Sequence, residues 1–388
     1  MDIIFVLGAS QALFLSLLVF NKKGKSHGDY VLGAWLAFMG LHLIEYYVHS
    51  TGIHFEYPHL LGLGECFPML QGPFMFVYVL LMIGEKGKLK PVYLLHGLPF
   101  LIFMIYFLLD FYLLGAEEKL AYYLELVEHG SPVLSIATIL NNFLGPVYVV
   151  LSLVKLSRHA RNISNRFSYT EEIDLKWLRY VLAGMGVVWT AVLVSYILDW
   201  FITNEELGNQ LIYGTLTVAV FFLGFYGIKQ QAIYIPAPAT PRPQPQPEKA
   251  RVTVSADTDR YKNSGLKKEA AERYLKELLA YMEEEKPYLN GRLSLKDVAQ
   301  YLNISVNHLS QIINEQLHKS FFDFVNTYRV EEVKRLLSES RHEQLTLLAI
   351  AYDSGFNSKS SFNSIFKKIT GVTPSQYLKL KSDQAQNS

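Results

Sequence analysis

The distribution of apolar residues divides the chain into two unlike parts. From Met1 to Tyr234 long apolar runs alternate with short polar segments, whereas Pro236–Ser388 has the mixed composition of a soluble domain. The runs lack the continuous polar face of a helix on the surface of a soluble protein. Each is close to the length of about 20 residues that a helix needs to cross a bilayer core. Seven runs qualify: Ile3–Phe20, Tyr30–Val48, Leu61–Ile83, Val92–Leu114, Val133–Val154, Leu178–Phe201 and Leu211–Ile228.

The runs predict an all-α protein whose residues 1–234 form a bundle of seven transmembrane helices. The alternative is a very apolar soluble helical domain. The third run contains Pro68, Gly72 and Pro73, so we expect a kink in that span. Proline inside a span is tolerated where neighbouring helices satisfy the backbone groups that it frees.

Basic residues are distributed unevenly among the polar segments that separate the runs. One set of segments contains Lys22, Lys23, Lys25, Lys86, Lys88, Lys90, Lys155, Arg158, Arg161, Arg166 and Lys176. In the alternate set Lys119 is the one basic residue, among several glutamates. Because loops rich in Lys and Arg stay in the cytoplasm, seven spans place the N-terminus outside and the C-terminus inside.

A proline-rich linker is predicted over residues 235–265, beginning with the sequence IPAPATPRPQPQP at Ile235. Such a sequence favours extended polyproline II conformation and behaves as a semi-rigid spacer. We favour a plain spacer over a recognition site for a partner. A helical pattern starts at Leu266 and continues over Ala270–Glu285, where Pro287 ends it. The predicted soluble domain covers residues 266–381, and residues 382–388 are expected to be a disordered tail.

This soluble domain contains an internal repeat with a period of about 52 residues, in which Leu293–Ala299 matches Leu345–Ala351. Each copy has a hydroxyl side chain suited to cap a short helix and ends with an alanine, where two helices approach closely. Asn303-Ile304-Ser305 and Gly355-Phe356-Asn357 then interrupt the pattern, and Asn or Gly suits the left-handed residue of a turn. The repeat predicts two helix-turn-helix units, at about 293–318 and 345–370, joined by a helix over Phe321–Ser338.

The second helix of each unit, at about 306–317 and 358–369, has one apolar and one polar face. The residues expected to face the core are Leu309, Ile312, Ile313, Leu317, Phe362, Ile365, Phe366 and Ile369. The polar faces contain Asn307, Ser310, Gln311 and Asn314, and Ser360, Asn363, Ser364 and Lys367. Short amide and hydroxyl side chains along a helix suit base edges in the major groove. Lys359, Lys367 and Lys368 suit phosphates.

A polar face on a single helix is weak evidence, but its recurrence after the same capped helix and turn is specific. Leu293–Leu380 also resembles the DNA-binding domain of AraC/XylS-type transcription regulators, whose fold is homeodomain-like. The matching positions are Arg329, Gly355-Phe356, Phe362, Phe366-Lys367-Lys368, Gly371 and Thr373-Pro374-Ser375. The resemblance implies that the two second helices enter successive major-groove turns of double-stranded DNA. Ser364 stands where many members have arginine, so the second unit is expected to read fewer bases.

The seven-span region occupies the place of the soluble ligand pocket that usually accompanies this domain. The whole chain is therefore similar to membrane-anchored AraC-type regulators of bacteria, located in the cytoplasmic (inner) membrane. Polar residues inside spans are costly in lipid and usually face the bundle interior. The candidates for a signal site are His42, Glu45, Glu65, Gln71 and His96. A pocket for a small-molecule or protein signal is one interpretation, and plain interhelical hydrogen bonding is the favoured alternative.

The leading hypothesis is a one-component transcription regulator that binds promoter DNA and responds to a signal sensed in the membrane region. Control by homodimerisation or by proteolytic release is expected, since the linker is a poor rigid rod. The alternative is a membrane transporter or enzyme with a regulatory DNA-binding tail. We find no nucleophile–base set, phosphate loop or metal motif, and a single cysteine, Cys66, excludes a cysteine-rich zinc site. We therefore expect no enzymatic activity, cofactor or metal.

Overall fold

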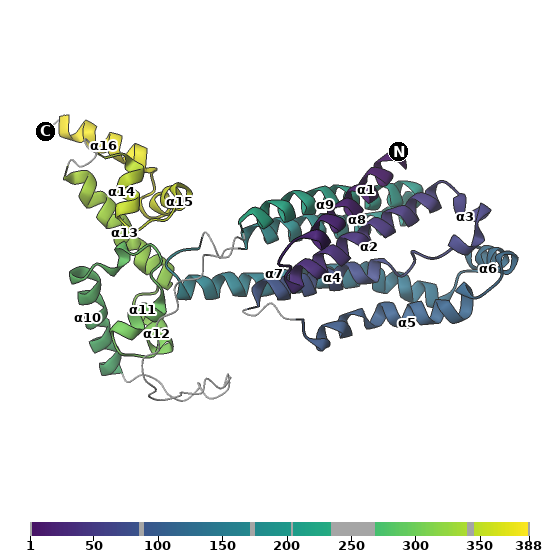
Figure 1. Cartoon of the computed structure of the whole chain (residues 1–388), viewed down its shortest axis with the longest axis horizontal. Helices are drawn as coiled ribbons and strands as arrows, with labels where there is room; N and C mark the ends of the chain where they lie inside the picture. Colours follow the sequence, from purple (N-terminus) through teal and green to yellow (C-terminus); the bar gives the residue numbers. More distant parts are fainter. Residues whose placement is uncertain are drawn as a thin grey trace. The chain divides into compact units, whose positions relative to one another are not determined.

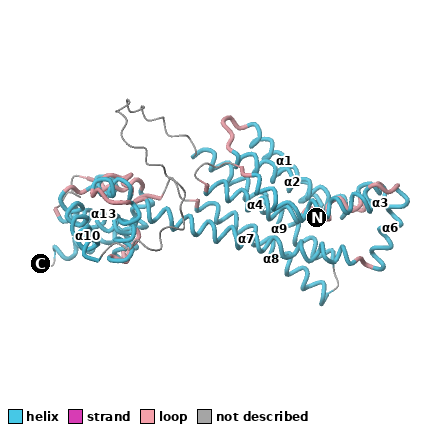
Figure 2. Tube along the Cα trace, turned by 90° about the horizontal axis from the view of Figure 1, so that it is seen from below, coloured by secondary structure: helices cyan, strands magenta, loops and turns pink. Residues whose placement is uncertain are grey.

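The computed structural model describes residues 2–84, 89–170, 175–202, 205–233, 268–339 and 345–386. Within these ranges every regular element is helical, and the β-type pairing is limited to one isolated bridge, between Phe167 and Ser294 (Figure 2). The expected all-α class is confirmed for this part of the chain. The predicted linker, residues 235–265, lies outside the described residues. The chain forms two compact units, one of Met1–Arg158 with Leu175–Arg242 and one of His159–Asp174 with Pro243–Ser388.

The first unit is a bundle of apolar helices (Figure 1). Its helices are α1 (Asp2–Asn21), α2 (His27–Ser50), α3 (Ile53–Glu56), α4 (Pro68–Ile83), α5 (Leu98–Phe107), α6 (Ala116–His129), most of α7 (Pro132–Arg166), α8 (Lys176–Ile202) and α9 (Glu205–Ile233). Short turns of other helical types occur at η1 (Pro58–Leu60), η2 (Pro91–Gly97) and η3 (Leu108–Tyr112). Helix α1 packs against α2 and α9, α8 against α9, and α2 against α4. Trp35, Met39 and Leu182 are completely buried in the resulting core.

The outer surface of this bundle is apolar as well. Of the most apolar stretch of Pro91–Tyr112, which has a mean hydropathy of 2.1, 6% is buried within the structure. Leu94 is 75% exposed and Leu109 is 71% exposed. Soluble proteins rarely expose contiguous apolar patches larger than a few hundred Å², so this surface needs an apolar environment. Six helical segments of the described residues are long and apolar enough to cross a membrane: Ile3–Asn21, His27–Ser50, Pro91–Tyr112, Pro132–Arg166, Lys176–Leu198 and Leu207–Gly224.

The expected third span is shorter than the sequence predicts. Helix α4 begins at Pro68, so the part of the predicted span from Leu61 to Phe67 consists of turns. Proline suits the first helical turn, because its missing N–H has no partner there in any case. The prediction of a helical span that starts at Leu61 was therefore wrong, because the helix begins only at Pro68; Pro73 lies inside it. At 16 residues α4 is about 24 Å long, less than a bilayer core of about 30 Å.

The fifth span shows the opposite deviation. The sequence predicts a span ending at Val154 and a basic loop from Lys155 onward, but α7 continues as a helix to Arg166. Its 35 residues make a helix of about 52 Å, well beyond the thickness of a bilayer core. Lys155, Arg158 and Arg161 thus lie on a helix instead of a loop. The end of this helix, from His159, belongs to the second unit.

The second unit contains the predicted repeat. Its helices are α10 (Lys268–Glu284), α11 (Leu295–Tyr301), α12 (Val306–Gln316), α13 (Phe321–Ser338), α14 (Leu347–Asp353), α15 (Lys359–Thr370) and α16 (Pro374–Gln386), with the turn η4 at Pro287–Leu289. Helix α16 continues to Gln386, where the sequence predicts a disordered tail from residue 382. The residues that follow Pro374 contain no further proline and no glycine to end a helix.

Two separate hydrophobic cores lie in this unit, and α13 contributes to both. The first core joins α10, α11 and α12 to the beginning of α13, through Phe321, Phe324 and Val325. The second core joins α14 and α15 to the remainder of α13, from Val330 to Leu337. Each helix-turn-helix unit therefore has a core of its own. The long helix that the sequence predicts over Phe321–Ser338 is the element that connects them.

Candidate nucleic-acid interface

The turns of the two helix-turn-helix units have the same backbone structure. In the first, Asn303 has a φ of 52° and the N–H of Ile304 donates to the carbonyl of Ala299 at 3.0 Å. In the second, Gly355 has a φ of 89° and the N–H of Phe356 donates to the carbonyl of Ala351, also at 3.0 Å. The sequence prediction that Asn and Gly supply the left-handed turn residue is confirmed.

The repeat lengthens by one residue within the turn. Ser305 caps α12 and Ser358 caps α15, each accepting a hydrogen bond from the backbone N–H three residues later, at 3.1 Å. Residues before the turn are therefore related by 52 positions, and residues after it by 53. With this offset Asn307 corresponds to Ser360 and Asn314 to Lys367. The extra residue, Asn357, donates from Nδ2 to the carbonyl of Gly291 at 2.7 Å, which fastens the second turn to the first unit.

The inward faces of α12 and α15 match the sequence prediction with one exception. The buried residues are Leu309, Ile312 and Ile313 in α12 and Phe362, Ile365 and Phe366 in α15. Ile369, predicted to face the core, is 36% exposed. It lies in the last turn of α15 and is not among the residues of the second core. The two helices are thus anchored by corresponding apolar triplets and present corresponding polar faces.

The polar faces are accessible. Asn307 and Asn314 are exposed on α12, with Ser310 and Gln311 partly exposed between them. On α15 the exposed residues are Lys359, Ser360, Asn363, Ser364, Lys367 and Lys368. On α12 the side chains are held by their own helix, since Asn314 Nδ2 donates to the Ser310 carbonyl at 2.8 Å and Gln311 Nε2 to Glu315 at 3.0 Å. These amides retain acceptor oxygens for base edges.

The lysines on α15 differ in their surroundings. Lys368 Nζ lies 2.6 Å from a carboxylate oxygen of Asp323, on α13. In a DNA complex its ammonium group would interact with both this carboxylate and a phosphate. Lys359 and Lys367 are exposed on the same helix. Of the three predicted phosphate contacts, Lys368 therefore also serves to hold α15 against α13.

Arg329 is buried at the junction of the domain, a role that the sequence pattern did not show. It is 2% exposed and lies on α13 between the two cores. Its Nε donates to the Tyr288 carbonyl and its Nη2 to the Asn290 carbonyl, both at 2.8 Å. Its Nη1 donates to Asn326 Oδ1 at 3.2 Å. The available signal was that Arg329 lies next to Val330, Val333 and Leu336 on the apolar stripe of the predicted helix.

In the first unit the predicted signal residues lie in separate surroundings. The Trp35 indole N–H donates to Gln71 Oε1 at 2.8 Å. His42 Nε2 lies 3.3 Å from the Tyr213 hydroxyl. His96 Nδ1 lies 3.0 Å from the Tyr148 hydroxyl. Three of the five candidates therefore take part in hydrogen bonds between helices, the alternative that the sequence favoured.

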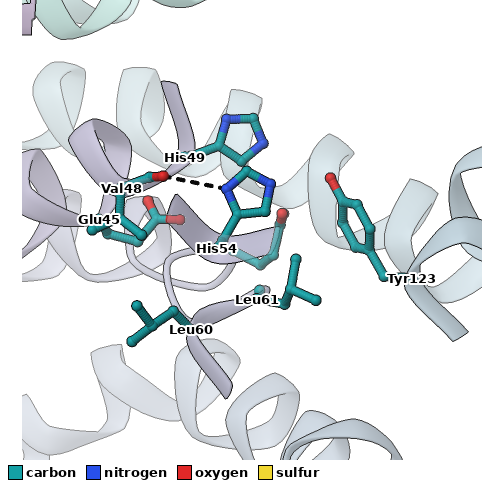
Figure 3. A pocket seen from close by; sticks show the side chains of 9 residues that line it. Glu45, Val48, His49, His54, Leu60, Leu61 and Tyr123 are labelled. Atoms are coloured by element: carbon teal, nitrogen blue, oxygen red, sulfur yellow. Dashed lines mark hydrogen bonds between the residues drawn. The ribbon is translucent and has the colours of Figure 1, made fainter. Parts of the chain in front are cut away.

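Glu45 and Glu65 share one small pocket, which is lined also by His49, His54 and Tyr123 (Figure 3). The two imidazole rings stack with their centroids 4.8 Å apart, and His54 Nδ1 donates to the Val48 carbonyl at 3.3 Å. His54 Nε2 is buried and has no hydrogen-bond partner among the described residues. Glu65 belongs to the non-helical segment that precedes α4. The interrupted third span thus places polar groups beside α2, although no group of three metal-ligating residues occurs in the described part of the chain.

Comparisons with known proteins concern the second unit. Residues 298–380 match the family model described as a helix-turn-helix domain. The chain is 28% identical over 116 residues to the melibiose operon regulatory protein of Escherichia coli, which covers 30% of this chain and 36% of that protein. It is 39% identical over 85 residues to an HTH-type transcriptional regulator of Staphylococcus aureus, covering 22% of this chain and 11% of that protein. No solved structure matches significantly. The C-terminal region is thus a helix-turn-helix domain of the AraC type, which implies DNA binding.

Proposed function

We propose that this chain, whose C-terminal region is an AraC-type helix-turn-helix domain, is a membrane-anchored transcription regulator that binds promoter DNA sequence-specifically. The observation that carries the proposal is the recurrence of the same turn and the same exposed polar face on α12 and α15. Two such helices on one domain suit successive turns of the major groove. One relative is named as an operon regulatory protein and the other as an HTH-type transcriptional regulator, which supports the same conclusion.

The anchoring part of the proposal rests on the exposed apolar surface of the first unit. The seven expected spans would be the six long apolar helices together with α4. Helix α4 is short, but ten of its residues are buried against other parts of the unit. A helix surrounded by protein does not need to match the full thickness of the lipid. Seven crossings keep the basic segments and the DNA-binding domain in the cytoplasm of a bacterium.

A gel-shift titration of the full-length protein in lipid nanodiscs tests DNA binding. The DNA is a duplex that the wild-type protein selects from a randomised library. Lys367→Ala is compared with Lys276→Ala, which removes an exposed lysine from α10. Loss of a phosphate contact should weaken binding and lower the slope of log K against log salt by about 1. Equal affinities and slopes for the two variants would contradict the proposed placement of α15.

Labelling of single cysteines tests the topology in intact cells. The natural cysteine, Cys66, is buried and gives a low background. A membrane-impermeant maleimide should label Glu118→Cys, on the side expected to be external, and should leave Lys23→Cys unmodified until the cells are opened. The reverse pattern, or labelling of both positions, would refute the orientation.

Glu45 and Glu65 are the residues at which we place signal sensing. Non-helical backbone at membrane depth is tolerated where protein or a cavity surrounds it, and the segment before α4 supplies such backbone beside Glu45. Glu45→Gln should alter the response of a transcriptional reporter, whereas Glu56→Gln, an exposed glutamate on α3, should not. Identical reporter responses would remove this pocket from the mechanism.

A transporter with a regulatory DNA-binding tail is the second candidate, because interrupted helices line the substrate sites of many transporters. The break before α4 is the observation that favours it. Deletion of residues 266–388 separates the two functions. Uptake that requires this chain and survives the deletion would support the transporter. Loss of promoter control in the deletion variant, in cells where no uptake requires this chain, would support the regulator.

A further inference from the structure

We infer that the segment Phe167–Tyr169 is a built-in ligand of the DNA-binding domain, and that it links helix α7 to the placement of the two reading helices. The inference rests on the proposed function and names the route by which the membrane region would control it. The segment follows α7 directly, and it belongs to the same compact unit as the helix-turn-helix domain.

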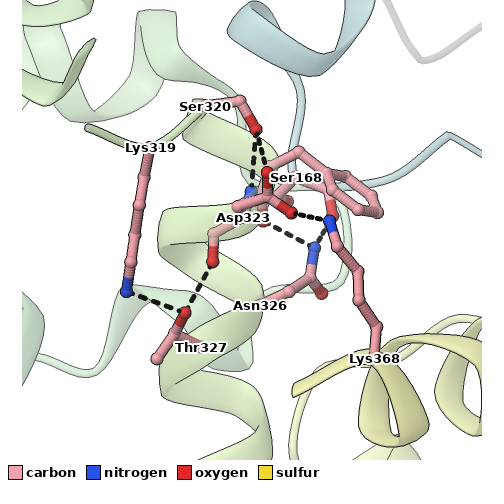
Figure 4. Close-up of polar contacts among 8 residues, drawn as sticks. Ser168, Lys319, Ser320, Asp323, Asn326, Thr327 and Lys368 are labelled. Carbon is pink, nitrogen blue, oxygen red and sulfur yellow. Dashed lines mark hydrogen bonds and ion pairs between the residues drawn. The ribbon is translucent and has the colours of Figure 1, made fainter. Parts of the chain in front are cut away.

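Ser168 uses each of its polar groups in this contact, and Figure 4 shows its contact with Asn326. Its backbone N–H and its hydroxyl both donate to the Leu293 carbonyl, at 3.1 and 2.6 Å. Its hydroxyl oxygen accepts from Arg329 Nη2 at 3.1 Å. Its carbonyl accepts from Arg329 Nη1 at 2.9 Å and from Asn326 Nδ2 at 3.1 Å. The residue is 1% exposed, and the adjacent Phe167 forms the antiparallel bridge with Ser294.

The binding site on the domain is incomplete without this segment. A guanidinium group has five N–H donors, and Arg329 directs them to the carbonyls of Tyr288 and Asn290, to Asn326 and twice to Ser168. Without Ser168, two N–H groups of the buried Arg329 guanidinium lose their acceptors. An unpaired buried charge is unfavourable in the low-dielectric interior. Ser168 is almost completely buried, so a larger side chain at this position has to displace its neighbours.

The contact lies where the two helix-turn-helix units meet. Asn326 and Arg329 fall on α13 between the residues of the first core, which end at Val325, and those of the second, which begin at Val330. A Cβ atom at Gly355, in the second turn, would lie 2.3 Å from the Tyr288 carbonyl and 3.1 Å from Arg329 Nε. Arg329 therefore contacts the segment that precedes α11 in the first unit and lies close to the turn of the second unit. A ligand that fixes Arg329 also fixes how the two units lie relative to each other.

Covalent continuity connects this site to the membrane region. Ser168 is the second residue after Arg166, at which α7 ends, and α7 begins in the apolar run at Pro132. A shift or rotation of α7 is therefore delivered to Ser168 through Phe167 alone. This route does not use the proline-rich linker, which is a poor transmitter of motion. Two reading helices bind adjacent major-groove turns only at the correct separation, so a change at their junction alters affinity for DNA.

The test compares Ser168→Arg with Ser164→Arg in full-length protein in lipid nanodiscs. Ser164 lies on α7, and its hydroxyl donates to the Arg161 carbonyl at the protein surface, so it is a matched control. Amide hydrogen exchange is measured over residues 167–170 and 288–294. Ser168→Arg places a second cation beside Arg329 and should accelerate exchange there at least tenfold, while Ser164→Arg leaves it unchanged. Unchanged exchange in the core of α12 shows that the domain remains folded.

DNA affinity is then measured for the duplex that the wild-type protein selects from a random library. Ser168→Arg should weaken binding at least fivefold and Ser164→Arg less than twofold. Ser168→Ala, which keeps the backbone contacts, should give an intermediate loss. Equal exchange rates in Ser168→Arg and Ser164→Arg would refute the docking of Phe167–Tyr169 on the DNA-binding domain. Accelerated exchange in Ser168→Arg with unchanged affinity for DNA would refute the coupling between this docked segment and DNA binding. Absence of salt-dependent DNA binding by the wild-type protein refutes the proposed function, and the exchange measurement still decides whether the segment docks.

Discussion

Replacement of Arg329 by methionine tests the junction most directly, because methionine keeps a long unbranched side chain and removes the donors. Three backbone carbonyls, those of Ser168, Tyr288 and Asn290, lose a donor. Asn290 is exposed and water can satisfy it, and the Ser168 carbonyl keeps its hydrogen bond from Asn326 Nδ2. The buried Tyr288 carbonyl and the buried Asn326 Oδ1 lose Arg329 as their donor. Each buried acceptor left unsatisfied costs about 1–3 kcal/mol. The two together predict a loss of about 4 kcal/mol in the free energy of unfolding.

This loss is large beside the total stability of about 5–15 kcal/mol of a typical domain. The assay is native-state hydrogen exchange of the α13 amides in the full-length protein, because these amides exchange through opening of the domain. A loss of about 4 kcal/mol corresponds to a protection factor lower by about a thousandfold. Arg273→Met is the control, since Arg273 is 65% exposed on α10 and its ion pair with Glu277 is a surface pair of little value.

A decrease of less than tenfold for Arg329→Met, or one equal to that of Arg273→Met, would refute the reasoning. It would mean that water or a rearranged loop satisfies the carbonyls, and that the junction is not held by Arg329. Faster exchange confined to residues 288–294, with α13 unchanged, would also contradict it. In that case the loop would open locally while the two cores remained joined by α13.

Three further predictions concern the same domain. Gly355→Ala adds a Cβ 2.3 Å from the Tyr288 carbonyl at a φ of 89°, so it should lower the free energy of unfolding by about 3–5 kcal/mol. Gly371 has a φ of 82° but open space around it, so Gly371→Ala should lower the free energy of unfolding by about 1–2 kcal/mol. Hydrogen bonding to Arg335 lowers the pKa of Glu332, so this carboxylate stabilises the fold above its unfolded pKa of about 4.3. The stabilisation is lost as the pH falls through the pKa of the folded state. The urea midpoint should therefore depend less on pH, between pH 7 and 3, in Glu332→Gln than in the wild-type protein. Asn363→Ala should relax base preference at one position of the selected site by about 1–3 kcal/mol, with thermal stability unchanged, and a general loss of affinity without altered preference would count against base reading.

The agreement between sequence and structure is closest where periodicity alone specifies an element. The bounds of α13 and the identity of the turn residues Asn303 and Gly355 follow from local patterns: an apolar stripe, a capping hydroxyl and a left-handed residue. The base-reading and phosphate-binding assignments on α12 and α15 stay predictions, although the exposure of these side chains is compatible with them. Within the apolar runs the signal is weaker, because a run shows that a helix is apolar and not where it starts. This explains the misplaced start of α4.

The sequence by itself determined that the chain is helical, that apolar helices precede a tandem helix-turn-helix domain, and which faces of α12 and α15 are polar. These properties depend on residues close together in the chain. The tertiary structure decided that α7 continues to Arg166 and that Ser168 completes the hydrogen bonding of Arg329, which is 161 residues away in sequence. No local pattern encodes that contact, because the pairing of this serine and this arginine depends on a fold that brings distant parts of the chain together. The physical reason is the cost of a buried cation without acceptors, which makes a short polar segment after α7 part of the DNA-binding domain.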